Sequence, residues 1–527
     1  MKILLIGTFL LGLIGCGSDT TSQNTNQDTS ATTLNVLAGS EIKDLAENSE
    51  LMNDLRAKTG IDLKFTYTGT IEGIDKIENG QEQPDIAWFA QDKYFHLMDT
   101  KHLIKESTKT MISPVVLGVK TSVAKSLGWK DGKTTWKDVE KAVSNKNFRY
   151  AMTSPTTSNS GFSAVVGITT AFSGNGNAAK TKDVDNARLS SFFKGQKIFS
   201  GSSGWLADAY VKNESTVDGI INYESIILGL KDRADKPSQP LTVIAPKDGT
   251  VIADYPMVLI NSDKKTSYDK VLTWIKSNEI QTKIMNETHR RPILSSIRLA
   301  SEFNTSLLID TPFPGSKNTI DAMLLAYLNQ HRVAGHSIFV LDKTGSMSET
   351  DGTDKQRIQR VRDGLYVLTG SDLSTTGKFA KFDNREKITI ETFSEQPEIV
   401  KTFTMKSAND QNVFTGIRQI ADNIQPDGNT AIYDALETAL DEASKDTSGR
   451  YVSIVLMTDG ESNHGETAQE FLNKYHQRNK HVHIFTIGIG DSKSEELTKI
   501  SEETGGKYFD GRKEDLSNVF KTIRGYQ

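Results

Sequence analysis

Short oxygen-bearing side chains gather in three separated turns of the C-terminal third of the chain. The turns are Asp342-Lys343-Thr344-Gly345-Ser346, Gly428-Asn429-Thr430-Ala431 and Met457-Thr458-Asp459-Gly460. The first and third directly follow apolar runs, residues 336–341 and 452–457, that are typical of buried parallel strands. Loops at the carboxyl ends of neighbouring parallel strands converge at one edge of a sheet. Hydroxyls and carboxylates without His or Cys suit a hard divalent cation such as Mg2+, so the pattern predicts a metal site.

The Asp-x-Thr-x-Ser turn, the distant Thr and the later Thr-Asp-Gly resemble the metal-ion-dependent adhesion site (MIDAS) of a von Willebrand factor A (VWA) domain, over residues 334–527. The resemblance implies that Thr344 and Ser346 bind the ion directly, and Thr430 directly or through water. Asp342 and Asp459 would act through bound water. The ion implied is Mg2+, with Mn2+ or Ca2+ as alternatives, and an acidic side chain of a partner protein would complete its coordination. The family's commonest first hydroxyl is Ser, where this chain has Thr344.

A competing resemblance links Asp342-Lys343-Thr344-Gly345 to the phosphorylated loop of P-type ATPases and haloacid-dehalogenase phosphatases. Asp342 would then be a nucleophile that forms an aspartyl phosphate. The later acidic loop of that family has a second carboxylate that residues 459–464 lack, and the phosphatase interpretation gives Thr430 no role. Taken singly, each turn is also an ordinary strand-to-helix connection, where Asp, Ser and Thr serve as caps. Taken together, the three favour the adhesion site.

The N-terminus indicates an exported, lipid-anchored protein. Met1-Lys2 precedes an apolar run, residues 3–14, that is too short to span a bilayer and is typical of a signal peptide. Leu13-Ile14-Gly15-Cys16 resembles the lipobox of bacterial lipoproteins, and Cys16 is the only cysteine in the chain. The resemblance implies removal of residues 1–15, diacylation of Cys16 and a membrane anchor on the extracytoplasmic side. The alternative is a chain that is uncleaved or simply secreted.

Composition excludes several classes of function. The chain has 527 residues, 36% of them hydrophobic and 24% charged, which is ordinary for globular material and too long for one domain. The formal net charge is -5 and no basic run stands out, so nucleic acid is not an expected partner. Residues 16–32 begin with Cys16 and continue as a polar, flexible tether without core-forming side chains. We find no nucleophile elbow and no His spacing for zinc, and we predict no enzyme.

The region 33–333 predicts a β-α-β-α-β order and hence a parallel sheet. Its expected elements are strands at 34–40, 61–67 and 85–89, a helix at 41–58, a strand at 150–153 and a helix over the apolar run 162–172. The segment resembles the extracellular solute-binding proteins of ABC transporters, in the group that includes molybdate-type oxyanion binders. Such proteins have two lobes that close on a solute by hinge motion. Carried over by position, the resemblance directs Ser40, Thr70, Ser158 and Tyr223 toward the cleft, with a small solute as ligand and an anion as one candidate.

The boundary between the two parts is expected after a helix over residues 318–331, in which Ile320, Met323, Leu324 and Leu328 share one face. Beyond it, strands at 387–393 and 481–489 alternate with helices at 357–368, 431–444, 494–504 and 514–523. That alternation is doubly wound. The predicted fold class is therefore α/β, a two-lobed periplasmic-binding-protein-like region (33–333) followed by a doubly wound, Rossmann-like VWA domain (334–527).

The expected function is that of a surface lipoprotein that captures a protein partner through its metal site. A second hypothesis is an ABC-transporter receptor that delivers a small solute to a permease, with the VWA domain as a docking module. A third is the aspartyl-phosphate phosphatase, and a fourth is a scaffold whose cleft no longer binds solute. The sequence alone does not rank the second against the fourth.

Overall fold

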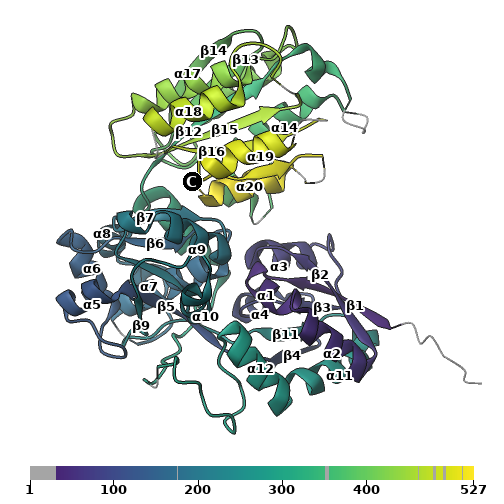
Figure 1. Cartoon of the computed structure of the whole chain (residues 1–527), viewed down its shortest axis with the longest axis vertical. Helices are drawn as coiled ribbons and strands as arrows, with labels where there is room; N and C mark the ends of the chain where they lie inside the picture. Colours follow the sequence, from purple (N-terminus) through teal and green to yellow (C-terminus); the bar gives the residue numbers. More distant parts are fainter. Residues whose placement is uncertain are drawn as a thin grey trace, which may run out of the picture.

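The chain folds into three bodies of α/β architecture, which Figure 1 shows as two lobes and a third domain packed above them. The computed structural model describes residues 31–526 apart from 175, 305, 351–354, 375, 461, 479–481, 491–493, 513 and 515. The predicted signal peptide, Cys16 and nearly all of the predicted tether lie outside the described residues. Within the described ranges, no helix has the length and apolarity that crossing a bilayer requires. The predicted α/β class is confirmed, and each body has its own sheet.

The first lobe is a five-stranded sheet in the order β2-β1-β3-β11-β4. Its strands are β1 (Thr32–Ala38), β2 (Ile61–Tyr67), β3 (Ile86–Trp88), β4 (Glu106–Lys109) and β11 (Pro256–Leu259). Strands β1, β2 and β3 pair in parallel as predicted, whereas β11 runs antiparallel to both β3 and β4. The lobe's helices are α1 (Lys43–Ala46), α2 (Ser49–Thr59), α3 (Thr70–Glu78), α4 (Lys93–Met98), α11 (Lys265–Ile275) and α12 (Asn278–Thr288).

The single helix expected over 41–58 was wrong, because the chain breaks between α1 and α2. Asn48 adopts an extended backbone conformation there, and its side chain accepts a hydrogen bond from the backbone amide of Leu51. A side-chain acceptor at this position satisfies one of the free amides of a helix start. The local cap therefore starts a new helix, α2, inside a segment whose apolar spacing looked continuous.

The second lobe is a sheet in the order β10-β5-β8-β6-β7, with β9 also paired to β5. Its strands are β5 (Ser113–Lys120), β6 (Tyr150–Thr153), β7 (Gln196–Ser200), β8 (Gly219–Tyr223), β9 (Leu241–Ile244) and β10 (Ile252–Ala253). Its helices are α5 (Thr121–Leu127), α6 (Trp136–Ser144), α7 (Asn159–Ser173), α8 (Asn186–Phe193), α9 (Ser203–Lys212) and α10 (Glu224–Gly229). The chain passes between the lobes after β4 and again after β10, as a hinged two-lobed fold requires.

The third body is a six-stranded sheet in the order β14-β13-β12-β15-β16-β17. Its strands are β12 (Gly335–Asp342), β13 (Lys387–Phe393), β14 (Pro397–Thr404), β15 (Tyr451–Thr458), β16 (His483–Gly488) and β17 (Tyr508–Asp510). All pairs are parallel except that of β14, an antiparallel edge strand the sequence analysis did not anticipate. Alternate residues of β12 enter two separate apolar cores, one on each face. Both faces are thus covered by helices, which is the doubly wound arrangement.

The helices of this body are α14 (Arg357–Leu368), α15 (Gly377–Ala380), α16 (Gln411–Asn423), α17 (Ile432–Ser444), α18 (Ala468–Arg478), α19 (Ser494–Glu503) and α20 (Leu516–Tyr526). The predicted helix 357–368 is confirmed at both ends, and three others are confirmed within three residues. The sequence analysis did not identify α16 or α18. The chain's C-terminal helix, α20, ends beside the second lobe (Figure 1).

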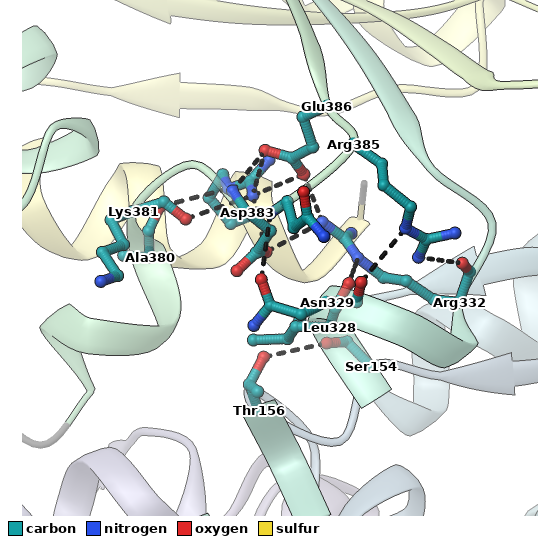
Figure 2. A network of polar contacts seen from close by, with 12 residues as sticks. Ser154, Thr156, Leu328, Asn329, Arg332, Ala380, Lys381, Asp383, Arg385 and Glu386 are labelled. Atoms are coloured by element: carbon teal, nitrogen blue, oxygen red, sulfur yellow. Dashed lines mark hydrogen bonds and ion pairs between the residues drawn. The ribbon is translucent and has the colours of Figure 1, made fainter. Parts of the chain in front are cut away.

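The connection to the third body is a helix held by a buried ion network (Figure 2). The predicted helix 318–331 is present as α13 (Lys317–Ala326) followed by one π-helical segment, Tyr327–His331, and its four predicted apolar residues are buried. Arg332, directly after it, pairs with Asp383 at 3.1 Å and with Glu386. Arg524 of α20 reaches the same two carboxylates at 3.1 and 2.7 Å. The connecting helix, the start of β13 and the C-terminal helix are therefore tied at one buried point.

Candidate metal centre and solute cleft

The first predicted ligand loop begins where β12 ends, at Asp342. This residue is 0% exposed, and its two carboxylate oxygens accept hydrogen bonds from the Thr344 amide (2.8 Å) and the Thr458 hydroxyl (2.6 Å). Burial, reinforced by the nearby charge of Asp459, raises the pKa of the Asp342 carboxyl to about 6. The carboxylate is thus fixed beneath the loop and oriented by two donors.

The hydroxyls of the same loop form a chain of contacts that leads to Asp459. The Thr344 and Ser346 hydroxyl oxygens lie 3.1 Å apart, and the Ser346 hydroxyl donates to Asp459 Oδ1 at 2.9 Å. Asp459 directly follows β15, the strand adjacent to β12. Parallel pairing of β12 and β15 therefore brings the first and third predicted turns together, as expected from their positions after neighbouring strands.

The loop that carries Thr430 lies against both of these turns. The Gly345 amide donates to the Gly428 carbonyl at 3.1 Å, and the Thr430 amide donates to the Asn463 side chain at 2.9 Å. Gly428 has φ +81°, a conformation that glycine adopts without strain. Thr430 itself is buried. All five predicted metal residues consequently belong to three loops that touch at one sheet edge.

The cleft between the two lobes contains a cavity of about 790 Å³. Ser40, Thr70 and Ser158 line it, as the sequence analysis expected. Thr70 opens α3 and Ser158 precedes α7, so two helix N-termini face the cavity. Tyr223 does not line it: the ring is fully buried, and its hydroxyl accepts from the side chain of Asn159 at 2.9 Å. Asn159, directly after the predicted Ser158, takes its place in the wall.

Residues 34–286 match the family of bacterial extracellular solute-binding proteins, and residues 338–522 match the von Willebrand factor type A domain. The chain combines a solute-binding domain with a VWA domain. The VWA match spans the three loops of the predicted metal site, and the solute-binding match spans the lining residues of the two lobes except Glu287, Thr288 and His289. Domains of both kinds are typically not enzymes, and the first indicates an extracytoplasmic location.

Curated relatives match only part of the chain. Calcium-activated chloride channel regulator 1 from Bos taurus is 29% identical over 189 residues, which are 35% of this chain and 18% of that protein. An uncharacterized protein of Synechocystis is 27% identical over 189 residues, 35% of this chain and 39% of that protein. The chain thus spans well under half the length of either relative.

Two solved structures are similar to separate parts of the chain. The periplasmic binding protein AfuA from Actinobacillus pleuropneumoniae is 13% identical, with a TM-score of 0.42, over 57% of this chain and 98% of that one. A von Willebrand factor type A protein from Catenulispora acidiphila is 14% identical, with a TM-score of 0.29, over 37% of this chain and 43% of that one.

The donor set at the edge of the VWA sheet fits a hard divalent cation. VWA domains commonly bind such an ion, and every candidate ligand here is a hydroxyl or carboxylate oxygen. In the described part of the chain, no three His, Cys, Asp or Glu side chains gather as a metal cluster. Any site at this edge therefore depends on the hydroxyls of Thr344, Ser346 and Thr430 as well as on the two carboxylates.

The sequence analysis missed Arg357, which lies beside the predicted ligands. Its guanidinium donates to Asp459 Oδ2 at 2.9 Å and pairs with Glu349 at 3.0 Å. Arg357 is the first residue of α14, where the helix dipole disfavours a cation. An arginine at a helix start was the available signal, because such a position needs a compensating carboxylate, and Asp459 and Glu349 supply it.

Proposed function

We propose that the VWA domain of this protein captures an acidic side chain of a partner protein through a divalent metal ion. The observation that supports this best is the chain of contacts from Thr344 through Ser346 to Asp459, with Asp342 held beneath it. Mg2+ bound here would supply one open coordination position for an incoming carboxylate. Thr344, Ser346 and Thr430 would hold the ion, while Asp342 and Asp459 would orient its waters and offset its charge.

The geometry argues against the phosphatase alternative. A nucleophilic aspartate must present a free oxygen to the phosphorus atom. Asp342 is fully buried and both of its oxygens already accept hydrogen bonds, from Thr344 and Thr458. The same burial suits a carboxylate that acts on the ion from below. We therefore favour binding over group transfer.

We further propose that the protein is held to a membrane by lipid on Cys16, with residues 17–32 as a tether, a solute-binding region at 33–333 and the VWA domain at 334–527. The proposed lipid anchor rests on the resemblance of residues 13–16 to a lipobox. Metabolic labelling with a radioactive or clickable fatty acid tests it. Label on the wild type that is absent from Cys16→Ala supports the anchor, and equal label on both contradicts it.

The metal site is tested by calorimetric titration of Mg2+ and Mn2+ into the folded chain. Asp342→Asn and Thr344→Val preserve side-chain shape, and we expect each to abolish saturable binding. Asp441→Ala is the matched control, because Asp441 is an exposed carboxylate on α17, away from the three loops, that pairs with Arg478. Binding that survives in both site variants would overturn the proposed site.

Partner capture is tested by immobilising the chain and passing extracytoplasmic proteins over it in Mg2+. We expect a protein that elutes with a chelator and that an Asp342→Asn column does not retain. Equal retention on both columns would mean that the partner, if any, binds away from the metal edge.

The second candidate function is reception of a small solute in the cleft. The cavity of about 790 Å³, with hydroxyls at two helix N-termini, supports it. Such a cleft suits a polar ligand with an anionic group, since helix N-termini favour negative charge.

A further inference from the structure

The solute cavity has a third wall. Besides the two lobes, residues of the VWA domain line it, among them Phe379 of α15, Lys507 before β17, and Lys521 and Tyr526 of α20. Figure 1 shows α20 at the end of the VWA domain that faces the lobes. The cavity is therefore not enclosed by the solute-binding domain alone.

This third wall is closely packed against the second lobe. A Cβ atom on Gly525 would lie 2.3 Å from the Thr157 hydroxyl oxygen, and one on Gly201 would lie 2.9 Å from the Tyr526 ring. The Trp205 and Tyr526 rings contact edge to face, with centroids 5.2 Å apart. Contacts this close leave no room for even one added methyl group, so α20 is seated on the lobe.

Side chains also cross between the two domains. Phe379 of the VWA domain is buried within the apolar core of the solute-binding domain. In the opposite direction, Trp205 of the second lobe packs against the core of the VWA domain. Reciprocal insertion of aromatic side chains makes this a fixed, apolar junction. The VWA domain and the second lobe should therefore move as one rigid unit when the cleft opens or closes.

The first lobe contacts this rigid unit at Thr157, the residue that also contacts α20. A Cβ atom on Gly69 would lie 2.7 Å from the Thr157 carbonyl oxygen. Thr157 therefore touches Gly69 of the first lobe through its backbone and Gly525 of the VWA domain through its side chain. Opening of the cleft separates the first contact, and undocking of the VWA domain separates the second.

The charged side chains on the cavity wall are paired, with one exception among the described residues. Each lining carboxylate already accepts from a donor: Glu41 from the Ala90 amide, Asp44 from Arg290, Glu72 from Lys76, Asp208 from Arg233, Asp232 from His289 and Glu287 from Asn48. Among lining cations within the described ranges, Lys507 has no ion-pair partner, whereas Lys521 pairs with Asp372 at 2.7 Å. The Lys507 ammonium lies over the Trp205 and Phe509 rings, at 5.4 and 5.1 Å from their centroids.

A second cation, Lys43 of the first lobe, lines the same cavity. Burial lowers the pKa of Lys507; the negative charge of Glu514 opposes this shift, and the positive charge of Lys43 adds a smaller contribution in the same direction as burial. Two like charges that face one cavity from different bodies repel each other, and an anion between them removes that repulsion.

We propose that the VWA domain completes the solute site, and that an oxyanionic group of a small solute binds between Lys43 of the first lobe and Lys507 of the VWA domain. This inference rests on the second proposed function, reception of a solute in the cleft. It adds that the solute contacts the VWA domain directly. Solute binding and docking of the VWA domain then stabilise each other, because a ligand that contacts both favours the state in which they meet.

The test is calorimetric titration of inorganic sulfate, inorganic phosphate and citrate into the folded chain, with Lys507→Met beside the wild type. We expect saturable binding of at least one anion and a loss of about tenfold or more in affinity for the variant. Lys499→Met is the matched control, since Lys499 lies on α19 of the same domain but off the cavity, and it should stay within about twofold of the wild type. No binding of any of the three anions, or equal binding by Lys507→Met, would overturn the proposal.

A second pair of variants tests the wall without changing charge. Gly525→Leu places a side chain where Thr157 already lies, so we expect weaker anion binding, whereas Gly315→Ala, away from the cavity, adds a Cβ that meets nothing within 4 Å and should bind as the wild type does. Unchanged anion affinity in Gly525→Leu would contradict a wall supplied by the VWA domain. Mg2+ titration of the same variants separates the two proposals, since the metal loops contain none of these positions. A protein that fails to bind Mg2+ but binds an anion would contradict only the metal site. A protein that binds Mg2+ but no anion would contradict only the solute site.

Discussion

The metal edge and the solute cavity both present hydroxyls and carboxylates, but the chain assembles them in different ways. The metal edge consists of three loops of one sheet, and its side chains bond to one another, as in the contacts of Ser346 with Thr344 and Asp459. The cavity collects side chains from two lobes and the VWA domain. Its key lysines, Lys43 and Lys507, come from different bodies and make no contact with each other that could hold them in place.

This difference separates a self-contained site from a composite one. The metal edge depends on strand pairing inside the VWA domain, so it should persist wherever that domain is folded. The cavity depends also on how the VWA domain is docked. Changes that loosen docking should therefore weaken anion binding and leave metal binding unchanged, and each prediction below can break or sharpen that distinction.

The largest effect is expected from Glu386→Ala in the buried ion network of Figure 2. The change removes one of the two carboxylates that Arg332 and Arg524 share and leaves the other, Asp383, in place. Removing one partner of a buried ion network typically lowers the free energy of unfolding by about 3–5 kcal/mol. Urea unfolding measures this. Because Glu386 precedes β13, at the end of the strands opposite the metal loops, Mg2+ affinity of the folded protein should not change.

The control for that variant is Glu503→Ala, which removes the same charge from a partly exposed pair with His476. An exposed pair contributes less than about 1 kcal/mol. Equal unfolding midpoints for the two variants would show that the buried network does not hold the connection. Loss of metal affinity in folded Glu386→Ala would show that the metal edge is not self-contained.

The next effect is a pH dependence that belongs to the VWA domain. Glu391 of β13 is buried with no hydrogen-bond partner for its carboxyl in the described residues, and burial, with the charge of Glu442, raises its pKa to about 8. The unfolded chain loses this proton near pH 4.5 and the folded chain near pH 8, so stability falls as pH rises between those values. The loss amounts to at most about 5 kcal/mol.

Glu391→Gln removes this titration, so the variant should match the wild type near pH 5 and exceed its stability near pH 9. Burial lowers the pKa of His331 and His336 to about 4, which makes stability rise as pH increases from 4 to 6.5, but both proteins share that effect. Urea unfolding at several pH values gives the difference. Parallel pH profiles for the two proteins would refute the prediction.

A smaller effect is expected from Trp205→Ala, which removes the ring that contacts Tyr526 and lies under Lys507. Aromatic and cation–π contacts of this kind are each worth about 1 kcal/mol beyond burial. We expect faster hydrogen exchange in α20 and in residues 201–207, with anion affinity lower by several-fold. Mg2+ affinity should stay within about twofold. If the amides of α20 exchanged at the wild-type rate in the variant, α20 would dock independently of Trp205.

The two regions also differ in how far the sequence predicts them. The loops of Asp342 and Asp459 follow apolar runs typical of buried parallel strands, and parallel pairing of these strands brings the loops together. The places of Ser40, Thr70 and Ser158 on the cavity wall likewise follow from strand ends and helix starts, and their binding of a solute stays a prediction. Tyr223 was misplaced because it ends a strand, β8, whose last side chain points into the core.

The third wall could not be predicted from the sequence. Lys507, Gly525 and Tyr526 belong to no motif, and their place depends on how one folded domain rests on another. The antiparallel β14 was missed for a related reason, since five of its eight side chains are exposed in a row and lack the alternation of a half-buried strand. Local pattern predicts strand ends, whereas docking depends on whole surfaces.

Arg357 at the metal edge and Lys507 in the cavity are both cations beside a proposed binding site, and the contrast between them leads to the smallest predicted effect. At the metal edge, Arg357 is already neutralised by Asp459 and Glu349, at 2.9 and 3.0 Å. Its charge opposes a divalent ion but is largely offset, so Arg357→Gln should raise Mg2+ affinity by only about threefold, a change of less than 1 kcal/mol. In the cavity, Lys507 has no such carboxylate in the described residues, so its removal should cost an anion far more. Paired titrations of Mg2+ and phosphate into both variants measure this. A fall in Mg2+ affinity for Arg357→Gln would instead mean that the guanidinium orients Asp459, and the metal edge would then depend on α14 as well as on its three loops.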